Sequence, residues 1–407
     1  MHFNFCRTVD GYLGPIICRA LLLLKGALSF ISSPPKNELQ GTPKKIIIIK
    51  FLGMGTILLA SPSIRRIKEK YPSATITLLT LFDNRELCSI MRSFDQRFYV
   101  DIGGSPLRFF FSYLKILYAI RRERYDTVID LEFVTNFSAV TTLLITIFSK
   151  ATRIVGFNSP QNWRNSVYFH IVSFDHSRHI SMIFAKMLAI ITLDSTPIST
   201  EKEKEELLQA ADISFYETEP KLKNISENSQ RLICVNINSG PMSHLRRWPK
   251  ESFAHVIKQL IKKYDVLIVL IGGKGDVSYT NGFSQQFFET GNIINLCGKL
   301  SISQLIGLFF RSYFLITNDS GPLHIAATVG LPTISFFGPE TPYLYGPQGK
   351  KHHVFYSDIF CSPCLNIFNS KFADCHENVC LKQISPESVL KVIDEKFLPG
   401  LSILGEL

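Results

Sequence analysis

Residues 45–51 read KIIIIKF, a short apolar run rich in β-branched side chains, and such a run fits a strand buried on both faces of a sheet. A glycine turn, Gly53-Met54-Gly55, follows it directly. A helical pattern then covers 57–71, and a second strand is expected over 75–80. Strand, tight turn, helix and strand make a βαβ unit, which requires a parallel sheet.

The same succession begins again in the second half of the chain. A buried-strand pattern over 232–237 leads to a helical pattern over 251–263 and a strand over 266–271. Because 407 residues have room for two domains of ordinary size, we predict an α/β protein with two doubly wound, Rossmann-like domains. The other predicted strands are 98–101, 127–131, 153–156, 293–295, 314–318 and 333–337.

Composition along the chain indicates where the two domains meet. A charged helical segment, 201–211, is followed by a polar stretch with few large apolar residues, 217–231, which we interpret as the interdomain connection. The predicted parts are an N-terminal arm and linker (1–43), a first domain (44–216), the connection (217–231), a second domain (232–385) and a C-terminal helix and tail (386–407).

The chain has a formal charge of +10, from 44 Lys and Arg against 34 Asp and Glu. This surplus favours anionic partners such as nucleotides, phosphates, nucleic acid or an acidic lipid surface, although a merely basic soluble protein would show the same balance. Nucleic acid is the least supported of these partners. No recognisable module for it is present, and no basic patch is interleaved with aromatic residues.

The N-terminal region is apolar but interrupted by charge. Residues 11–32 contain Arg19 and Lys25, so no uninterrupted apolar run approaches the ~20 residues of a spanning helix. No small-x-small cleavage pattern follows, and we do not expect a secretory signal. We favour a helix that lies in the plane of a membrane with its cations near the headgroups, over one that docks on the protein's own body.

Ligands of doubly wound sheets bind at the carboxyl ends of the strands. One such end is followed by residues 319–324, DSGPLH, which open a helical segment. We expect Asp319 or Ser320 to cap this helix, and the amides after Gly321 to bind a phosphate with help from the helix dipole. His324, one turn further on, can add a hydrogen bond or a positive charge. An ordinary capped helix with a solvent-facing histidine is the alternative.

A second strand end carries Ser239 and Gly240, with Arg246 and Arg247 shortly behind. Adjacent guanidinium groups suit a diphosphate because each forms paired, planar hydrogen bonds to phosphate oxygens. A solvated basic turn is the alternative interpretation.

The third strand end is a glycine-rich loop, GGKGD, which begins at Gly272 and ends at Asp276, whose carboxylate could hold a ribose hydroxyl. The first-domain turn at 53–56 has neither the G-x-G-x-x-G spacing of a dinucleotide site nor the lysine-bearing phosphate loop of nucleotide hydrolases. The sequence therefore argues against a dehydrogenase or a nucleotide hydrolase.

In their order and spacing these motifs resemble glycosyltransferase family 9, the heptosyltransferases of lipopolysaccharide core assembly. The resemblance implies a GT-B fold with two domains facing a central cleft, and an inverting transfer that requires no metal or other cofactor. It also implies ADP-heptose as nucleotide-sugar donor and a lipid A-linked oligosaccharide as acceptor. The matching stretches, spread over 45–393, are IIIIKFLGMGTILLASPSIRRIKEKYP, YDTVIDLEF, RIVGF, SGPMSHLRRWPKESFAHVI, IGGKGD, TNDSGPLHIAATVGLPTISFFGPETP and CSPC.

The resemblance carries over to individual positions of this chain. Arg246 falls where the family has a basic residue on the phosphates, and Asp276 lies near its ribose contact. With the basic charge and the N-terminal helix, we expect a peripheral protein on the cytoplasmic face of the cytoplasmic membrane. The residues that would line the donor diphosphate are Asp319, Ser320, Gly321 and His324.

One position departs from the family pattern. Family members commonly carry an aspartate directly after the glycine of the first turn, where it serves as general base, and this chain has Thr56 there. A threonine hydroxyl accepts no proton at neutral pH. Asp130 and Glu132 follow another strand two residues apart, so both would point to one face. We expect Glu132 to be the substitute base; the alternative is a surface or acceptor-binding carboxylate.

The nine cysteines are an odd number, and several lie singly in apolar stretches, which indicates buried thiols in a reducing compartment. Four others lie within twenty residues near the C-terminus, and a structural zinc site, unpaired thiols and a disulfide are all compatible with their spacing. These four are Cys361, Cys364, Cys375 and Cys380.

Two functional hypotheses follow. The first is a glycosyltransferase that acts on a lipid-linked core oligosaccharide. The second is a catalytically silent member of the same fold that binds a sugar nucleotide without turning it over, which Thr56 would explain.

Overall fold

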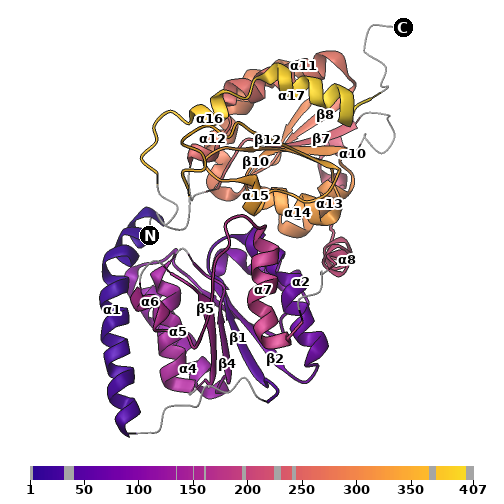
Figure 1. The fold of residues 1–407 in the computed structure, drawn as a ribbon. Helices are drawn as coiled ribbons and strands as arrows, with labels where there is room; N and C mark the ends of the chain where they lie inside the picture. The colour runs from indigo at the N-terminus through magenta and orange to yellow at the C-terminus, as the bar shows by residue number, and fades with distance from the viewer. Residues whose placement is uncertain are drawn as a thin grey trace. The chain divides into compact units, whose positions relative to one another are not determined.

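The computed structural model describes residues 3–31, 41–133, 135–149, 151–159, 162–194, 199–223, 231–240, 244–365 and 373–399. The chain divides into two compact units, Met1–Ser199 and Thr200–Leu407 (Figure 1). Each unit contains one six-stranded parallel sheet with helices against it. The prediction of an α/β protein built from two doubly wound halves is confirmed.

The sheet of the first unit has the strand order β3-β2-β1-β4-β5-β6. The isoleucines 46–49 of β1 are completely buried in the middle of this sheet, as the run of four β-branched residues predicts. Ile47 lies opposite Thr77 on one side and Val128 on the other. The strands are β1 (Lys45–Ile49), β2 (Thr75–Leu81), β3 (Gln96–Val100), β4 (Thr127–Asp130), β5 (Arg153–Phe157) and β6 (His170–Val172).

The helices of the first unit cover both faces of this sheet. Figure 1 shows α2 and α7 on one face and α4 and α5 on the other, and the two helices within each pair pack together. The helices are α1 (Phe3–Ile31), α2 (Met54–Lys70), α3 (Arg85–Ile90), α4 (Pro106–Glu123), α5 (Asn136–Ser149), α6 (Asn162–Asn165) and α7 (Ile180–Thr192).

The N-terminal helix α1 packs along α5. The approach is close at Gly14, where an added Cβ would lie 2.5 Å from the Cβ of Asn136, and Cys18 is completely buried one turn later. The helix therefore docks on the protein's own body, which was the less favoured of the two interpretations of the sequence. Contact of this helix with a membrane stays a prediction. Among the described residues, no helix combines the length and apolar character needed to cross a bilayer.

The second unit repeats the architecture with the strand order β12-β11-β10-β7-β8-β9. Trp248 is buried two residues before Lys250, where the next helix begins. Its ring stacks on Phe336 at 4.2 Å between centroids, and its Nε1 donates to the Ile384 carbonyl at 3.0 Å. The strands are β7 (Arg231–Asn236), β8 (Val266–Leu270), β9 (Ile293–Asn295), β10 (Phe314–Asn318), β11 (Thr333–Phe337) and β12 (His352–Tyr356).

Ten helices belong to the described part of the second unit. Among them α11 and α17 pack against each other, and α14 packs on α8 and α13. They are α8 (Glu201–Gln209), α9 (Phe215–Thr218), α10 (Pro220–Lys223), α11 (Lys250–Lys263), α12 (Val277–Ser284), α13 (Ile302–Phe310), α14 (Gly321–Val329), α15 (Pro342–Tyr345), α16 (Val379–Lys382) and α17 (Pro386–Val392).

The division between the units comes earlier in the chain than the polar stretch at 217–231. Because the second unit begins at Thr200, α8, α9 and α10 all belong to it. The stretch 217–231 thus includes α10, and its residues 224–230 lie outside the described residues, as do 32–40 of the N-terminal linker. Strands β6 and β12, which the sequence analysis did not predict, form one edge of each sheet.

Candidate functional site

The helix α14 begins at the carboxyl end of β10 with an open N-terminus. Ser320 is its N-cap residue, but no side chain caps the helix. The Ser320 hydroxyl instead accepts a hydrogen bond from Asn236 Nδ2 at 2.9 Å. The expectation that Asp319 or Ser320 caps this helix is therefore wrong, because neighbouring strand ends engage the serine. Pro322 has no amide hydrogen and the Leu323 amide donates to the Ser320 carbonyl at 3.2 Å, so the Gly321 amide is the first-turn donor left for an anion.

Arg246 joins this helix end to the loop after β7. Its Nη1 donates to Asp319 Oδ2 at 3.1 Å, and its Nη2 donates to the Ser239 carbonyl at 2.7 Å. The loop is fixed behind it, since the Trp248 amide donates to Asn318 Oδ1 at 2.8 Å. The sequence therefore brings Asp319, Arg246 and Ser239 into direct contact.

Arg247 lies beside a different group of residues. Its guanidinium stacks over the Tyr279 ring at 4.1 Å, and its Nη2 is 3.7 Å from Asp276 Oδ1. Asp276 also accepts a hydrogen bond from the Gly273 amide at 3.0 Å, so it closes its own glycine-rich loop as well as facing the arginine. Tyr279 was not predicted, because an isolated tyrosine within a helical segment carries no binding signal.

Both arginines have one buried nitrogen donor, Nε, without a hydrogen-bond partner among the described residues. The Nε atoms of Arg246 and Arg247 are buried and meet no hydrogen-bond acceptor among the described residues, which omit 241–243 just before them. A buried donor without a partner costs free energy, about 1–3 kcal/mol, and a guanidinium costs more. The Arg246 donor lies beside the N-terminus of α14 and the Arg247 donor beside Asp276, and both suit a site for an anionic ligand.

His324 lies one turn into α14 and is almost completely buried. Burial lowers the pKa of its imidazole; Asp319 opposes this shift and Arg246 adds to it. The ring is therefore neutral at pH 7 and can offer a hydrogen bond. Of the two roles expected from the sequence, a permanent positive charge is the less favoured.

The two predicted glycines shape the backbone around this site. Gly240 has φ of 71°, in the left-handed region that side chains disfavour. At Gly272 an added Cβ would lie 2.5 Å from Asn238 Nδ2 and 2.7 Å from Cys297 Sγ. Gly272 is thus required for close packing at the end of β8.

The turn after β1 in the first unit holds Thr56 in a structural role. Its Oγ1 lies 2.7 Å from the Gly53 carbonyl and 3.1 Å from that of Leu52, to which it donates. Gly53 has φ of 83°, and a Cβ there would lie 2.7 Å from the threonine hydroxyl. The threonine therefore closes the turn where the family pattern has a base.

Glu132 is completely buried and fully engaged. Its Oε2 accepts hydrogen bonds from Lys50 Nζ at 2.9 Å and from the Leu52 amide at 3.0 Å, and its Oε1 accepts one from the Phe133 amide at 3.1 Å. A general base must come within hydrogen-bond reach of the proton that it removes. The geometry therefore gives no support to Glu132 as the substitute base, because the carboxylate is paired and has no solvent-facing edge.

Asp130 is equally inaccessible. Its Oδ2 accepts a hydrogen bond from the Tyr168 hydroxyl at 2.7 Å, and Arg164 Nη2 lies 3.7 Å away. Burial raises the pKa of this carboxyl, while Arg164 and Tyr168 oppose the shift. Glu132 lies beyond the end of β4, and both carboxylates are buried in the interior of the first unit with different partners.

The four C-terminal cysteines influence one another. Burial raises the pKa of the Cys364 thiol, and nearby Cys375 and Cys361 raise it further. All eight cysteines whose side chains are described are free thiols, among them the buried Cys18, Cys88, Cys234 and Cys297. No set of three His, Cys, Asp or Glu side chains suited to a metal ion occurs in the described ranges, which leave out 366–372 between Cys364 and Cys375.

Known proteins resemble this chain over most of its length. The sequence pattern of glycosyltransferase family 9 (heptosyltransferase) matches residues 113–372. The lipooligosaccharide heptosyltransferase 2 of Campylobacter jejuni subsp. jejuni is 27% identical over 177 residues, 43% of this chain and 54% of that protein, so the match spans about half of the relative's length. The lipopolysaccharide heptosyltransferase 2 of Salmonella typhimurium is 22% identical over 324 residues, 76% of this chain and 87% of that protein.

Solved structures share the fold. The ADP-heptose lipopolysaccharide heptosyltransferase II of Escherichia coli superposes with a TM-score of 0.62 at 20% identity, over 87% of this chain and 98% of that one. A glycosyl transferase family 9 structure from Veillonella parvula gives a TM-score of 0.65 at 22% identity, over 89% and 99%. These likenesses confirm the GT-B fold. Since the family pattern also covers more than half of its length, this chain belongs to glycosyltransferase family 9 (heptosyltransferase).

Proposed function

We propose that this protein transfers a heptose from ADP-heptose to a lipid A-linked core oligosaccharide, with inversion at the anomeric carbon. The observation that carries the proposal is the anion site of the second unit. There an uncapped helix N-terminus stands beside Arg246, and the Nε donors of Arg246 and the next residue, Arg247, are buried and meet no acceptor in the described residues. The identity of the donor comes from relatives, since the E. coli structure is of an ADP-heptose enzyme.

The chemistry follows from where charge develops. As the acceptor hydroxyl attacks the anomeric carbon, the bond to the nucleoside diphosphate breaks and negative charge grows on the leaving phosphates. Arg246, Arg247 and the Gly321 amide at the start of α14 would stabilise that charge. His324 would donate a hydrogen bond from its neutral ring. Because these groups supply the positive charge, we expect transfer to need no added divalent cation.

The general base is then assigned to another carboxylate. Asp83 is exposed and lies in the short turn η1 (Phe82–Asn84) directly after β2, the neighbour of β1. Asn84 Nδ2 donates a hydrogen bond to the Phe51 carbonyl at 3.0 Å. Phe51 follows β1 and lies three residues before Met54, the first residue of α2, so the turn η1 is held beside the turn that contains Thr56. We nominate Asp83 as the base that compensates for Thr56.

The lipid-linked acceptor places the reaction at a membrane. We expect the protein to be peripheral on the cytoplasmic face of the cytoplasmic membrane, held there by α1. This helix presents an outward row of apolar side chains: Tyr12, Leu13, Ile16, Ile17, Leu23 and Leu24.

The test is an assay of ADP release from ADP-heptose, with and without lipid acceptor, with and without EDTA, and against other nucleotide sugars. We expect acceptor-dependent release that Asp319→Ala abolishes and EDTA leaves unchanged. Asp83→Asn should lower kcat about 100-fold or more while ADP still binds. Arg311→Gln, on the surface beside Tyr216, is the control and should behave as wild type.

The outcomes separate the alternatives. If ADP-heptose binds but no ADP is released with any acceptor, the protein is a silent sugar-nucleotide binder and Thr56 accounts for it. If Asp83→Asn turns over normally, the base lies elsewhere while the transferase function stands.

A further inference from the structure

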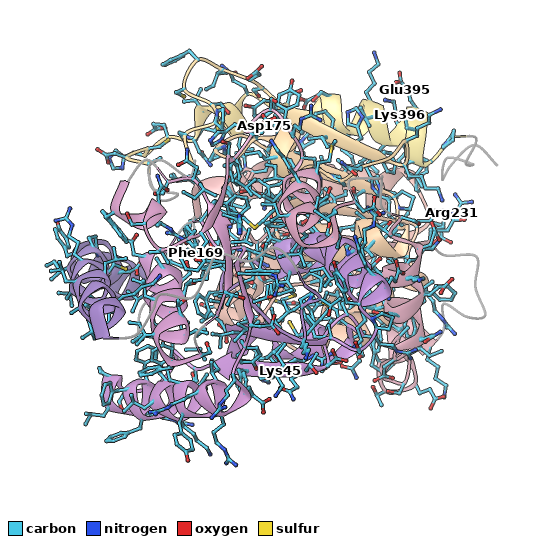
Figure 2. The ribbon with its side chains drawn as sticks, turned by 60° about the horizontal axis from the view of Figure 1, so that its bottom comes forward. Lys45, Phe169, Asp175, Arg231, Glu395 and Lys396 are labelled. Atoms are coloured by element: carbon cyan, nitrogen blue, oxygen red, sulfur yellow. The ribbon has the colours of Figure 1, made fainter. Side chains whose placement is uncertain are left out.

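The solvent-exposed face of α1 consists largely of apolar side chains. Leu23 is 77% exposed and Tyr12 is 76% exposed. Two of its charged residues, Asp10 and Lys25, instead contact the protein, while Arg19 is exposed among the apolar side chains. Asp10 accepts hydrogen bonds from the Asn136 amide at 2.7 Å and the Thr135 hydroxyl, and Lys25 lies over the Phe169 ring at 4.9 Å. A surface helix of a soluble protein has the opposite orientation. Figure 2 labels Phe169, which marks the docked side of α1.

A second helix of the same unit has a comparable face, which no motif in the sequence indicated. The core-facing side of α4 carries Tyr113, Leu117 and Ile120, all buried. On its other side, large apolar residues recur at intervals of three and four, so they line one face. Phe111 is 66% exposed. The full set on this face is Leu107, Phe110, Phe111, Leu114 and Tyr118.

Basic residues border this apolar face. Arg108, Lys115 and Arg122 are seven residues apart, so they form one row along its edge, and all three are exposed. The only acidic residue of α4 is Glu123 at its end, and its carboxylate is paired with Lys45 at 2.7 Å. Figure 2 labels Lys45. The helix therefore presents an apolar, aromatic surface with a positive edge that has no carboxylate partner among the described residues.

We propose that α4 is a second membrane-contacting element, which binds an anionic bilayer surface together with α1. Phe110, Phe111 and Tyr118 would enter the boundary between headgroups and acyl chains, and the basic row would lie at the lipid phosphates. Both helices pack on α5, which holds them on one unit. A second copy of this chain fits the surface less well, because pairing the α4 faces of two copies would bring two positive rows together.

The inference extends the peripheral location proposed above and does not depend on the transferase chemistry. It is tested by flotation of the full chain with vesicles of phosphatidylcholine alone and with added phosphatidylglycerol. The wild type should bind the anionic vesicles more strongly. Phe110→Ser/Phe111→Ser should lower bound protein several-fold. The triple change Arg108→Gln/Lys115→Gln/Arg122→Gln should lower the partition coefficient about fivefold per residue and remove the preference for anionic lipid.

Matched variants control for exposure and net charge. Phe310→Ser removes an exposed aromatic of the second unit, and Lys262→Gln/Lys350→Gln/Lys351→Gln removes three exposed lysines there. Both should bind as wild type. All variants change exposed side chains, so thermal melting should stay within a few degrees and report any that misfold.

Three results would overturn the inference. If Leu23→Ser/Leu24→Ser on α1 abolishes binding while both α4 variants bind as wild type, the peripheral location stands and α4 has no part in it. If no vesicle binds the wild type, both ideas fail. If light scattering shows a dimer that Phe110→Ser/Phe111→Ser converts to a monomer, α4 is a self-association surface instead.

Discussion

At the scale of single residues, the pair Lys50 and Glu132 is the clearest case of a charge that serves structure. Both side chains are buried, with 2.9 Å between Nζ and Oε2. Removing one partner leaves the other charged and without compensation, so Glu132→Gln should lower the free energy of unfolding by about 3–5 kcal/mol. Lys50→Met/Glu132→Met should lose less than Lys50→Met or Glu132→Gln alone, because no charge is left behind. Urea unfolding of the four proteins measures this, and a stability of Glu132→Gln equal to that of wild type would show that the carboxylate is solvated.

Arg246 and Arg247 should contribute separately to diphosphate binding. Each offers a charge-assisted hydrogen bond from its buried Nε, typically worth about 1.5–3 kcal/mol, so Arg246→Gln or Arg247→Gln should raise the Kd for ADP about 10- to 100-fold. Isothermal titration calorimetry with ADP measures the loss, with Arg311→Gln as the matched control. Equal Kd values for all three variants would place the diphosphate away from these side chains.

At the scale of elements, α14 should make the second unit sensitive to acid through His324. Its pKa is lowered by burial in the folded state and is about 6.5 when unfolded. Between the two values the unfolded chain binds more protons, so the free energy of unfolding falls as pH drops below 6.5. His324→Gln cannot titrate there and should lose less stability between pH 7 and pH 5. Chemical unfolding at both pH values compares the two proteins, and parallel losses would mean that His324 titrates normally when folded.

The elements that are easiest to predict from sequence are those with a continuous apolar run. Strands β10 and β11 are buried along their whole length and have the bounds expected from their apolar runs. Strands β6 and β12 lie at sheet edges, as the predicted β3 and β9 also do, and were missed because neither carries a buried apolar run. In β12 the residues HHVFY are all half-buried, so no continuous apolar pattern marks them. The outward face of α4 was missed for a related reason, since an apolar residue on a helix is ordinarily read as core.

That the strand-end residues lie together could be predicted from sequence and the pairing of Glu132 could not, for different physical reasons. Asp319 and the two arginines follow strand ends, and parallel strands bring such ends together regardless of side-chain detail. Whether the Glu132 carboxylate is free or paired depends instead on Lys50, which is 82 positions away in the sequence. The Lys50 ammonium comes into contact with Glu132 only because β1 and β4 pair in the folded sheet. Spacing along one strand carries no information about that contact.

At the scale of the whole molecule, the proposed donor site draws all its residues from one unit. Every group assigned to the diphosphate lies between Ser239 and His324, and this unit has its own core around Trp248 and Phe336. The fragment 200–407 should therefore fold cooperatively by itself, bind ADP within about threefold of the full chain's Kd and release no ADP from ADP-heptose, because it lacks Asp83 and the rest of the first unit. Calorimetry on the fragment, with its Arg246→Gln variant as control, tests this. A folded fragment that binds ADP far more weakly than the full chain would mean that the first unit supplies part of the nucleotide site.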